Sequence, residues 1–498
     1  MGHHALRSQR RRLERIPGGT RGGCPGTVRQ RIRCEREAIA ERTDPRTAHR
    51  GRACPQSARR LGRHDTREQG VWRIHQASAS RRHDSARTRR RYGEPGVLRA
   101  RACSVVSGPC SRRMSDLGRS DLTVVFSSDA LGGSELFNLE FLDIVREAEI
   151  RIHALVPGDG PLARALEPLA VNIATIPIPA ALVSMSRFQP GIEPSRLPRR
   201  ACALGSYLPR LARALGRSPG PVCSFGFRSQ LAVAAALRPR RRGIWVVHEV
   251  VPTGAPARLW RAASRRAGRI VTYSLCAASQ PALRDRGAEV RAVRFDLSRY
   301  CAIADVKRVR TIGLVGDLVE IKNHLLAVEL ARRLRAVGED VSVLLVGRDV
   351  SSSVPRAREY AERLRQIAAK TPGVELVSTT PEGMPEIIGQ IDVLLHLSSV
   401  PESFGRVCVE AMAAGRPVIA YDHGGVSELI DDARTGFLRP PGEPEAVFAA
   451  LLAIVRDDKL CAEIGRSARA QATERFGQRP DARDTIGHAL VEFATANR

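Results

Sequence analysis

Two glutamates separated by seven residues occur in the stretch PESFGRVCVEAMAAGRPV, residues 401–418. Glu402 lies in a Pro/Ser/Gly-rich turn, and Glu410 lies in a segment that is predicted to be helical. The helix is expected to begin near Gly405 and Arg406, where its free N–H groups and its dipole favour an anion. Carboxylate oxygens match the paired hydroxyl donors of a sugar or a ribose. Two glutamates at this spacing could bind the ribose and the transferred sugar of a nucleotide sugar. The alternative is that Glu402 is an exposed helix cap and Glu410 a solvated residue of the helix.

The segment that precedes these glutamates belongs to a regular alternation of strands and helices. Short, β-branched apolar runs such as DLTVVFSS, IRIHALV, VNIATIPIP, GIWVVHEV and GRIVTYS are each followed by a helix-length segment. A second series begins near residue 310 with RTIGLVG, VSVLLVG, VELVS, IDVLLHLSS and PVIAYD. This pattern predicts parallel strands that are covered by helices on both faces.

The two series predict two α/β domains of similar size. Four parts are expected: residues 1–113 as an Arg-rich extension, 114–305 as the first domain, 306–478 as the second domain, and 479–498 as a C-terminal helix that packs back on the first domain. Ligands of open parallel sheets bind beyond the carboxyl ends of the strands. We therefore expect two facing Rossmann-like domains with a ligand cleft between them.

The stretch PESFGRVCVEAMAAGRPVIAYDHGGVSELIDDARTGFL, residues 401–438, resembles the C-terminal signature of family 4 glycosyltransferases, which are retaining enzymes of GT-B fold. Their E-x7-E pattern falls on Glu402 and Glu410. Four further stretches resemble the family in the same order along the chain: SSDALGGSE, IWVVHEV, RRAGRIVTYSLCAASQ and GDLVEIKN. The resemblance covers roughly residues 121–480.

The resemblance implies roles for individual residues. Glu402, His248 and Lys322 are the expected catalytic residues, which respectively bind the donor sugar, lie near the reacting sugar and neutralise the diphosphate. The implied donor-binding positions are Glu410 for the ribose, the backbone of Phe404, Gly405, Arg406 and Val407, the glycine loop at Gly132 and Gly133, and again Lys322. With no D-x-D pattern in the chain, the resemblance implies neither a metal nor another cofactor.

Two positions depart from the family. Asp317 stands where the family usually has an arginine at the diphosphate, and VRFD, residues 293–296, replaces the family's NGVD. Arg348 or Arg406 could supply the missing cation. The sequence therefore leaves three hypotheses for the GT-B fold: a retaining glycosyltransferase of hexosyltransferase type, a catalytically weakened sugar-nucleotide-binding subunit, and a sugar-nucleotide epimerase.

The partners implied are a nucleotide-diphosphate sugar donor and an acceptor that the sequence does not identify, whether a glycan, a lipid or a small molecule. An expected setting is polysaccharide or glycolipid biosynthesis in the cytoplasm. The Arg/Pro-rich segment 186–200 has two interpretations, a solvated loop or a contact with an anionic lipid surface on the inner face of a membrane.

The net charge of +28 is unevenly spread along the chain. Residues 1–113 contain 29 arginines, no lysine and nine acidic residues, whereas residues 114–498 contain 51 basic and 43 acidic residues. The first segment has too few apolar runs to offset its ordering entropy. We expect it to be an upstream translation from a wrong start, with Met114 as the true one; the alternatives are a solvated disordered tail and a basic arm for nucleic acid or lipid. Nucleic acid is the least favoured partner.

The 11 cysteines include no C-x-x-C pair, and no apolar run of 18 residues occurs. An odd number of scattered cysteines favours reduced thiols in a cytoplasmic protein. Cys408, between the two glutamates, is predicted to pack as a small apolar residue rather than to act as a nucleophile.

Overall fold

The computed structural model describes residues 120–183, 197–238, 241–251, 254–350, 356–479 and 482–496. The expectations for residues 1–113, and for most of the segment 186–200, lie outside these ranges. The two sheets described below belong to one compact unit of the chain.

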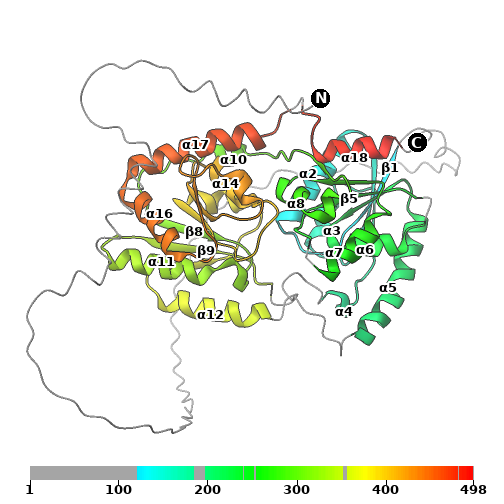
Figure 1. Cartoon of the computed structure of the whole chain (residues 1–498), viewed down its shortest axis with the longest axis horizontal. Helices are drawn as coiled ribbons and strands as arrows, with labels where there is room; N and C mark the ends of the chain where they lie inside the picture. Colours follow the sequence, from blue (N-terminus) through cyan, green and yellow to red (C-terminus); the bar gives the residue numbers. More distant parts are fainter. Residues whose placement is uncertain are drawn as a thin grey trace, which may run out of the picture. The chain divides into compact units, whose positions relative to one another are not determined.

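Seven parallel strands form the first sheet in the order β3–β2–β1–β4–β5–β6–β7. Figure 1 labels β1 and β5 of this sheet. The strands are β1 Asp121–Val125, β2 Arg151–Val156, β3 Asn172–Thr175, β4 Val222–Phe225, β5 Gly243–Val247, β6 Arg269–Thr272 and β7 Glu289–Val290. The helices of this half are α2 Gly133–Glu147, α3 Pro161–Leu166, α4 Ala180–Val183, α5 Leu197–Arg217, α6 Phe227–Ala236, α7 Ala255–Ser264, α8 Leu275–Ser279 and α9 Pro281–Arg284. The short helix α10 Ser298–Cys301 follows β7 in the chain but contacts helices of the second half. Every residue of β4 and of β5 is buried, as the continuous apolar run 243–247 predicts for a strand covered on both faces.

Six parallel strands form the second sheet in the order β10–β9–β8–β11–β12–β13. The strands are β8 Thr311–Val315, β9 Ser342–Val346, β10 Val374–Val377, β11 Val393–His396, β12 Val418–Tyr421 and β13 Phe437–Arg439. Its helices are the 3-10 turn η3 Glu320–Lys322, followed by α11 His324–Ala336, α12 Arg356–Lys370, α13 Met384–Gly389, α14 Arg406–Ala413, α15 Val426–Leu429, α16 Pro444–Arg456 and α17 Asp458–Phe476. The last helix, α18 Ile486–Thr495, follows them in the chain.

Counted from its own first strand, each sheet begins 3-2-1-4-5-6, which is the classic doubly wound order. The direction of winding reverses between β1 and β4 in the first sheet, and between β8 and β11 in the second. Ligands of such sheets bind outside the carboxyl ends of the strands at this reversal. The residues that follow β1, β8 and β11 are therefore the ones that the fold places at a ligand site. The expected fold class, two Rossmann-like domains built on parallel sheets, is confirmed.

Three strands escaped the sequence analysis, namely β4, β7 and β13. β4 is the serious omission, because it pairs with β1 at the reversal point of the first sheet. Its four residues, VCSF, are too few to show a period, and the flanking Pro221 and Gly226 resemble a loop.

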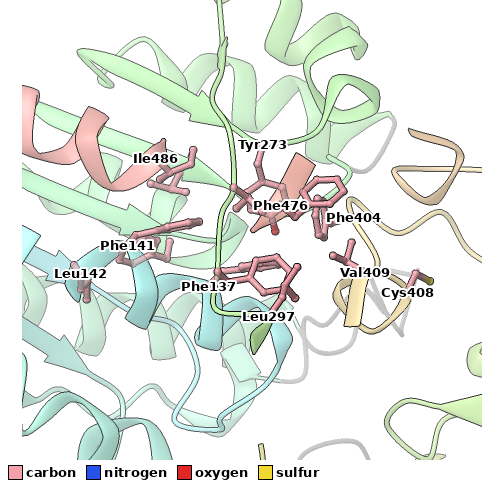
Figure 2. Packing of buried hydrophobic residues seen from close by; sticks show 14 of the residues in the cluster. Phe137, Phe141, Leu142, Tyr273, Leu297, Phe404, Cys408, Val409, Phe476 and Ile486 are labelled. Atoms are coloured by element: carbon pink, nitrogen blue, oxygen red, sulfur yellow. The ribbon is translucent and has the colours of Figure 1, made fainter. Parts of the chain in front are cut away.

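One apolar cluster includes residues from both sheets and from the last helices, and Figure 2 shows part of it. Phe137 of α2 and Tyr273 after β6 lie close to Phe404, which follows β11. Helix α18 contacts α2, β5 and β6, although it follows the second sheet in the chain. Among the described residues, no helix combines the length and the apolar character needed to span a membrane.

Candidate active site

Lys322 and Glu402 meet beyond the carboxyl ends of β8 and β11. Lys322 ends η3, and its Nζ lies 2.5 Å from Oε1 of Glu402, in the loop that follows β11. Both side chains are largely buried, with exposed fractions of 16% and 17%. A Cβ on Gly316 would lie 3.0 Å from Cδ of Lys322, so the lysine stem runs across the backbone at the end of β8. The structure thus brings together two residues that are 80 positions apart and were both predicted from the sequence.

His396, the last residue of β11, adjoins this pair and was not predicted. Its Nε2 lies 3.7 Å from Oε1 of Glu402, and only 5% of the side chain is exposed. Burial lowers the pKa of His396 to about 4, although the charge of Glu402 opposes the shift. The imidazole is therefore neutral near pH 7. The signal that could have revealed it is a histidine inside the otherwise apolar run VLLHL.

The loop that carries Glu402 folds against the HGGVSEL turn. Gly425 donates its N–H to the carbonyl oxygen of Glu402 at 2.7 Å. A Cβ on Gly425 would lie only 2.0 Å from the carbonyl oxygen of Ser403. Gly405 has φ +100°, which favours glycine, and a Cβ there would approach Val426 to 2.9 Å. Two parts of the stretch 401–438, the Glu402 loop and the HGGVSEL turn, are therefore one packed unit, which fixes the position of Glu402.

Glu410 is more buried than its expected place at a wet cleft suggests, with 5% of the residue exposed. It lies in α14, which begins at Arg406 as predicted, with Val407 half-buried in its first turn. Nε of Arg406 donates to Oε1 of Glu410 at 2.8 Å, one helical turn away. Burial together with the nearby carboxylate of Glu410 raises the pKa of Tyr300. The ribose role of Glu410 stays a prediction, since a ribose diol would have to share this carboxylate with Arg406.

The Arg406 side chain points toward the first half of the chain rather than toward Lys322. Its guanidinium lies 2.9 Å from Oε1 of Glu140 in α2, and it stacks over the rings of Phe137 and Phe295 at 4.9 and 4.7 Å. Burial lowers the pKa of Arg406, but Glu410 and Glu140 together raise it above its ordinary value. Burial also raises the pKa of Glu140 to about 7, against the influence of Arg406. Arg406 is therefore the centre of a buried charge network, and only its backbone is left for the expected phosphate contact.

The Phe404 ring anchors the loop in the aromatic part of the cluster (Figure 2). It packs edge-on against Phe137 and Tyr273, each at 5.3 Å between ring centroids, and against Phe476 of α17 at 5.5 Å. Such T-shaped pairs add to the stabilisation that burial provides. The predicted role of Phe404 concerned its backbone, and its side chain has this packing role in addition.

His248 follows β5 directly and is surrounded by aromatic rings. It stacks on Phe141 and Phe225, and its Nδ1 lies 3.2 Å from the Tyr273 hydroxyl. Burial lowers the pKa of His248 to about 3, so the ring is neutral near pH 7. Ser403 donates its hydroxyl to the carbonyl oxygen of His248. His248 thus contacts the Glu402 loop through its backbone, while its role at a reacting sugar stays a prediction.

The glycine loop after β1 contacts the second sheet through Arg348. Gly132 caps α2, and its N–H donates to Oε2 of Glu135 at 3.1 Å. NH1 of Arg348, which follows β9, donates to the carbonyl oxygen of Leu131 at 2.5 Å. The described residues leave open space within 4 Å of a Cβ on Gly133, whereas one on Gly132 would meet Glu135 at 2.8 Å. The two glycines that were predicted as a pair therefore differ, and Gly133 is the one with room beside it.

Metal-ligand side chains and Cys408 are the remaining groups of interest in the described part of the chain. Among the residues that the structure covers, no three His, Cys, Asp or Glu side chains are grouped to hold a metal ion, and metal independence stays a prediction. Cys408 is buried in α14, and burial raises the pKa of its thiol, which fits packing better than nucleophilic attack.

Residues 304–471 match the family model described as Glycosyl transferases group 1. The D-inositol 3-phosphate glycosyltransferase of Streptomyces avermitilis is 35% identical over 139 residues, which is 27% of this chain and 28% of that protein. The lipopolysaccharide 1,2-N-acetylglucosaminetransferase of Salmonella typhimurium is 32% identical over 125 residues, 24% of this chain and 32% of that protein. The chain thus spans about a third of the length of these curated relatives.

Solved structures extend the likeness to both sheets. A crystal structure of Anabaena Alr3699/HepE in complex with UDP and glucose superposes with a TM-score of 0.57 at 19% identity, covering 76% of this chain and 99% of that one. Sucrose-phosphate synthase from Thermosynechococcus elongatus gives a TM-score of 0.56 at 16% identity, covering 72% and 95%. At such identities the likeness concerns the fold, which is GT-B.

Proposed function

We propose that the protein is a glycosyltransferase that moves a sugar from a nucleotide-diphosphate sugar to an acceptor, with retention of the anomeric configuration. The observation that carries this proposal is the Lys322–Glu402 pair at the reversal point of the second sheet. Both residues lie within the segment that matches the Glycosyl transferases group 1 model. The names of the relatives and the UDP bound in the neighbouring structure support the same reaction class.

In the proposed mechanism, a cation of the protein acts on the diphosphate end of the donor and a carboxylate acts on its sugar end. Lys322 neutralises the diphosphate and stabilises the leaving group as the glycosidic bond breaks. Glu402 accepts hydrogen bonds from the donor sugar and stabilises the positive charge that develops on it. Their 2.5 Å contact keeps each charge compensated until the donor arrives. No enzymic nucleophile is required if the acceptor attacks from the face that the diphosphate leaves, with the leaving phosphate taking the acceptor proton.

The proposed acceptor is a glycan, a lipid or a small molecule, and the proposed setting is polysaccharide or glycolipid biosynthesis. The curated relatives include a phosphatidyl-myo-inositol mannosyltransferase of Mycobacterium leprae and the lipopolysaccharide enzyme described above. The lipid-linked molecules in these names support a lipid or glycan acceptor. We further propose a cytoplasmic enzyme that works peripherally on the inner face of a membrane, without a metal or other cofactor.

The test is a panel of UDP-, GDP- and ADP-sugars examined by thermal shift, followed by donor hydrolysis in the presence of EDTA. A ligand that binds the native state raises the melting temperature by mass action, so a slow enzyme still reveals its donor. Proton NMR of the released sugar then reports its anomeric configuration. The absence of any shift with every member of the panel would refute the proposal.

A second candidate function is a sugar-nucleotide-binding subunit with weakened catalysis. It is favoured by Asp317, which places a carboxylate where the family usually has an arginine. Binding of a donor without measurable hydrolysis or transfer would support this candidate over the enzyme. Recovery of a sugar nucleotide whose configuration is changed at one carbon would instead indicate an epimerase.

A further inference from the structure

Asp317 forms an ion pair with an arginine that follows the neighbouring strand. Nε of Arg348 donates to Oδ1 of Asp317 at 3.0 Å, and NH2 of Arg348 lies 2.9 Å from the same oxygen. Asp317 follows β8 and Arg348 follows β9, two parallel strands whose carboxyl ends share one edge. The positive charge of Arg348 therefore compensates the negative charge of Asp317.

The same guanidinium reaches the glycine loop of the first sheet. NH1 of Arg348 donates to the carbonyl oxygen of Leu131, and a Cβ on Gly132 would lie 3.2 Å from NH2 of Arg348. The two contacts with Asp317 and the hydrogen bond to Leu131 together engage three of the five N–H groups that a guanidinium carries. About a third of the side chain is exposed, 37% for Arg348 and 32% for Asp317. Arg348 therefore retains two N–H donors and an accessible face beside the loop.

Arg348 also lies in the same small region as Lys322. The backbone N–H of Leu318 donates to the carbonyl oxygen of Arg348 at 3.0 Å, which joins the two loops. A Cβ on Gly347 would lie 2.2 Å from the carbonyl oxygen of Gly316, and Gly316 itself lies under the stem of Lys322. The loops that carry the two cations are thus in direct contact. Arg406, the other candidate cation, is directed to Glu140 and Glu410 instead.

We propose that Arg348 supplies the second cation of the donor diphosphate site, and that Asp317 is the positioning residue that aims its guanidinium at the glycine loop. The proposal rests on the proposed function, since it specifies how that site holds the diphosphate. A planar guanidinium fixed on two sides presents its remaining N–H groups in a geometry that matches phosphate oxygens. The cation that the family carries after the first strand is in this chain carried after the second strand.

The test compares nucleoside diphosphates with nucleosides by calorimetric titration in EDTA, using UDP against uridine, GDP against guanosine and ADP against adenosine. In the Arg348→Ala variant, the affinity for the diphosphate that the parent binds should fall about 10- to 100-fold, as expected for a lost charge-assisted contact. The affinity for the corresponding nucleoside should stay within about twofold. Arg332→Ala is the matched control, because it removes an exposed arginine–glutamate pair on α11.

A charge exchange separates a phosphate contact from a purely structural link. The Asp317→Arg/Arg348→Asp double variant preserves the ion pair but moves the cation to the strand end where the family has it. It should recover most of the diphosphate affinity that Arg348→Asp alone loses. An equal loss for diphosphate and nucleoside in Arg348→Ala, or diphosphate binding at the parental level, would overturn the proposal while leaving the proposed function intact. If the parent binds none of the diphosphates, the proposed function and this inference fail together.

Discussion

At the scale of single residues, Glu402 and Glu410 share a motif but differ in environment. Glu402 is partly accessible and paired with Lys322, a cation from another loop. Glu410 is buried within α14 and paired with Arg406, one turn away on the same helix. Replacing each glutamate by glutamine should therefore change different properties of the protein: the turnover rate for Glu402, and donor affinity together with stability for Glu410.

Glu402→Gln should lower the turnover rate more than the apparent donor affinity. Glutamine keeps the shape and one acceptor oxygen, but it removes the negative charge that compensates the developing positive charge on the sugar. Steady-state kinetics with the donor identified by the panel measure this split. A turnover rate equal to that of the parent would restrict Glu402 to its structural ion pair with Lys322.

Glu410→Gln should instead weaken donor binding, by about one to two orders of magnitude if roughly 1.5–3 kcal/mol of charge-assisted hydrogen bonding is lost. It should also reduce stability, because Arg406 keeps only Glu140 as a charged partner in a buried network. Calorimetric donor titration and thermal unfolding of the same preparation measure both effects. Loss of stability with parental donor affinity would restrict Glu410 to a structural role.

The buried neutral histidines predict loss of stability in acid. The pKa of His248 is lowered to about 3 and that of His396 to about 4, so their contribution is fully present above the ordinary value of 6.5. It is lost as the pH falls through these folded-state values, because the unfolded chain binds the protons first. Each histidine adds a slope of up to about 1.4 kcal/mol per pH unit. Urea unfolding at pH 7, 6 and 5 should show a smaller slope for His248→Gln than for the parent, and an unchanged slope would contradict the burial of this ring.

The sequence predicted residues of the site where a local motif marks them. The stretch 401–410 gave both glutamates and the start of α14, and the short segment after β8 gave Lys322. Tyr300 and His396 were not assigned to the site, and Arg348 was named only as an alternative to Arg406, because their contacts arise from pairing between strands and halves that are distant in the chain. No local pattern encodes the contact of Arg348 with Leu131, which spans 217 positions.

At the scale of elements, the turns around Glu402 depend on glycines that the backbone leaves no room to replace. Gly425→Ala should cost about 2 kcal/mol or more, since its Cβ would overlap the Ser403 carbonyl oxygen and displace the Glu402 loop. Gly205→Ala is the control, because this glycine lies inside α5 with open space around a Cβ among the described residues. The control should gain about 0.5–1 kcal/mol from helix propensity. Thermal unfolding and donor binding are measured for both, and a Gly425→Ala variant as stable as the parent would refute the packing argument.

Element types were predictable wherever apolar runs are long enough to show a pattern. The strands around β1, β5, β8, β9 and β11 are continuous apolar runs, and their burial on both faces follows from the helices around them. β4 and β13 have four and three residues and depend on neighbouring strands for their hydrogen bonds. Tertiary pairing, which a local pattern does not contain, therefore decides that these short segments are strands.

At the scale of the whole molecule, several polar contacts connect the two sheets besides the aromatic cluster. Arg348 contacts Leu131, Ser403 contacts the carbonyl oxygen of His248, and Arg406 contacts Glu140. The most concentrated contact is that of Glu428, in α15, with the first turn of α8. Its carboxylate accepts hydrogen bonds from the Ser274 hydroxyl at 3.0 Å and from the backbone N–H groups of Leu275 and Cys276 at 3.0 and 2.6 Å. A helix start in one half is thus capped by a side chain from the other half.

Glu428→Ala should therefore uncouple the unfolding of the two halves. The variant leaves three donors without their carboxylate, and hydrogen bonds to a charged group contribute roughly 1.5–3 kcal/mol each before solvent replaces them. The buried pair Trp245 and Trp260 reports on the first sheet by fluorescence, once Trp72 is replaced by phenylalanine. Far-ultraviolet circular dichroism reports on both halves.

In the Trp72→Phe parent, the two signals should change at the same urea concentration, as coupled unfolding requires. In Glu428→Ala the fluorescence midpoint should separate from the dichroism midpoint, and Glu329→Ala, on the exposed face of α11, should behave like the parent. Coincident transitions at the parental midpoint in Glu428→Ala would show that the aromatic cluster around Phe404 couples the halves without this cap.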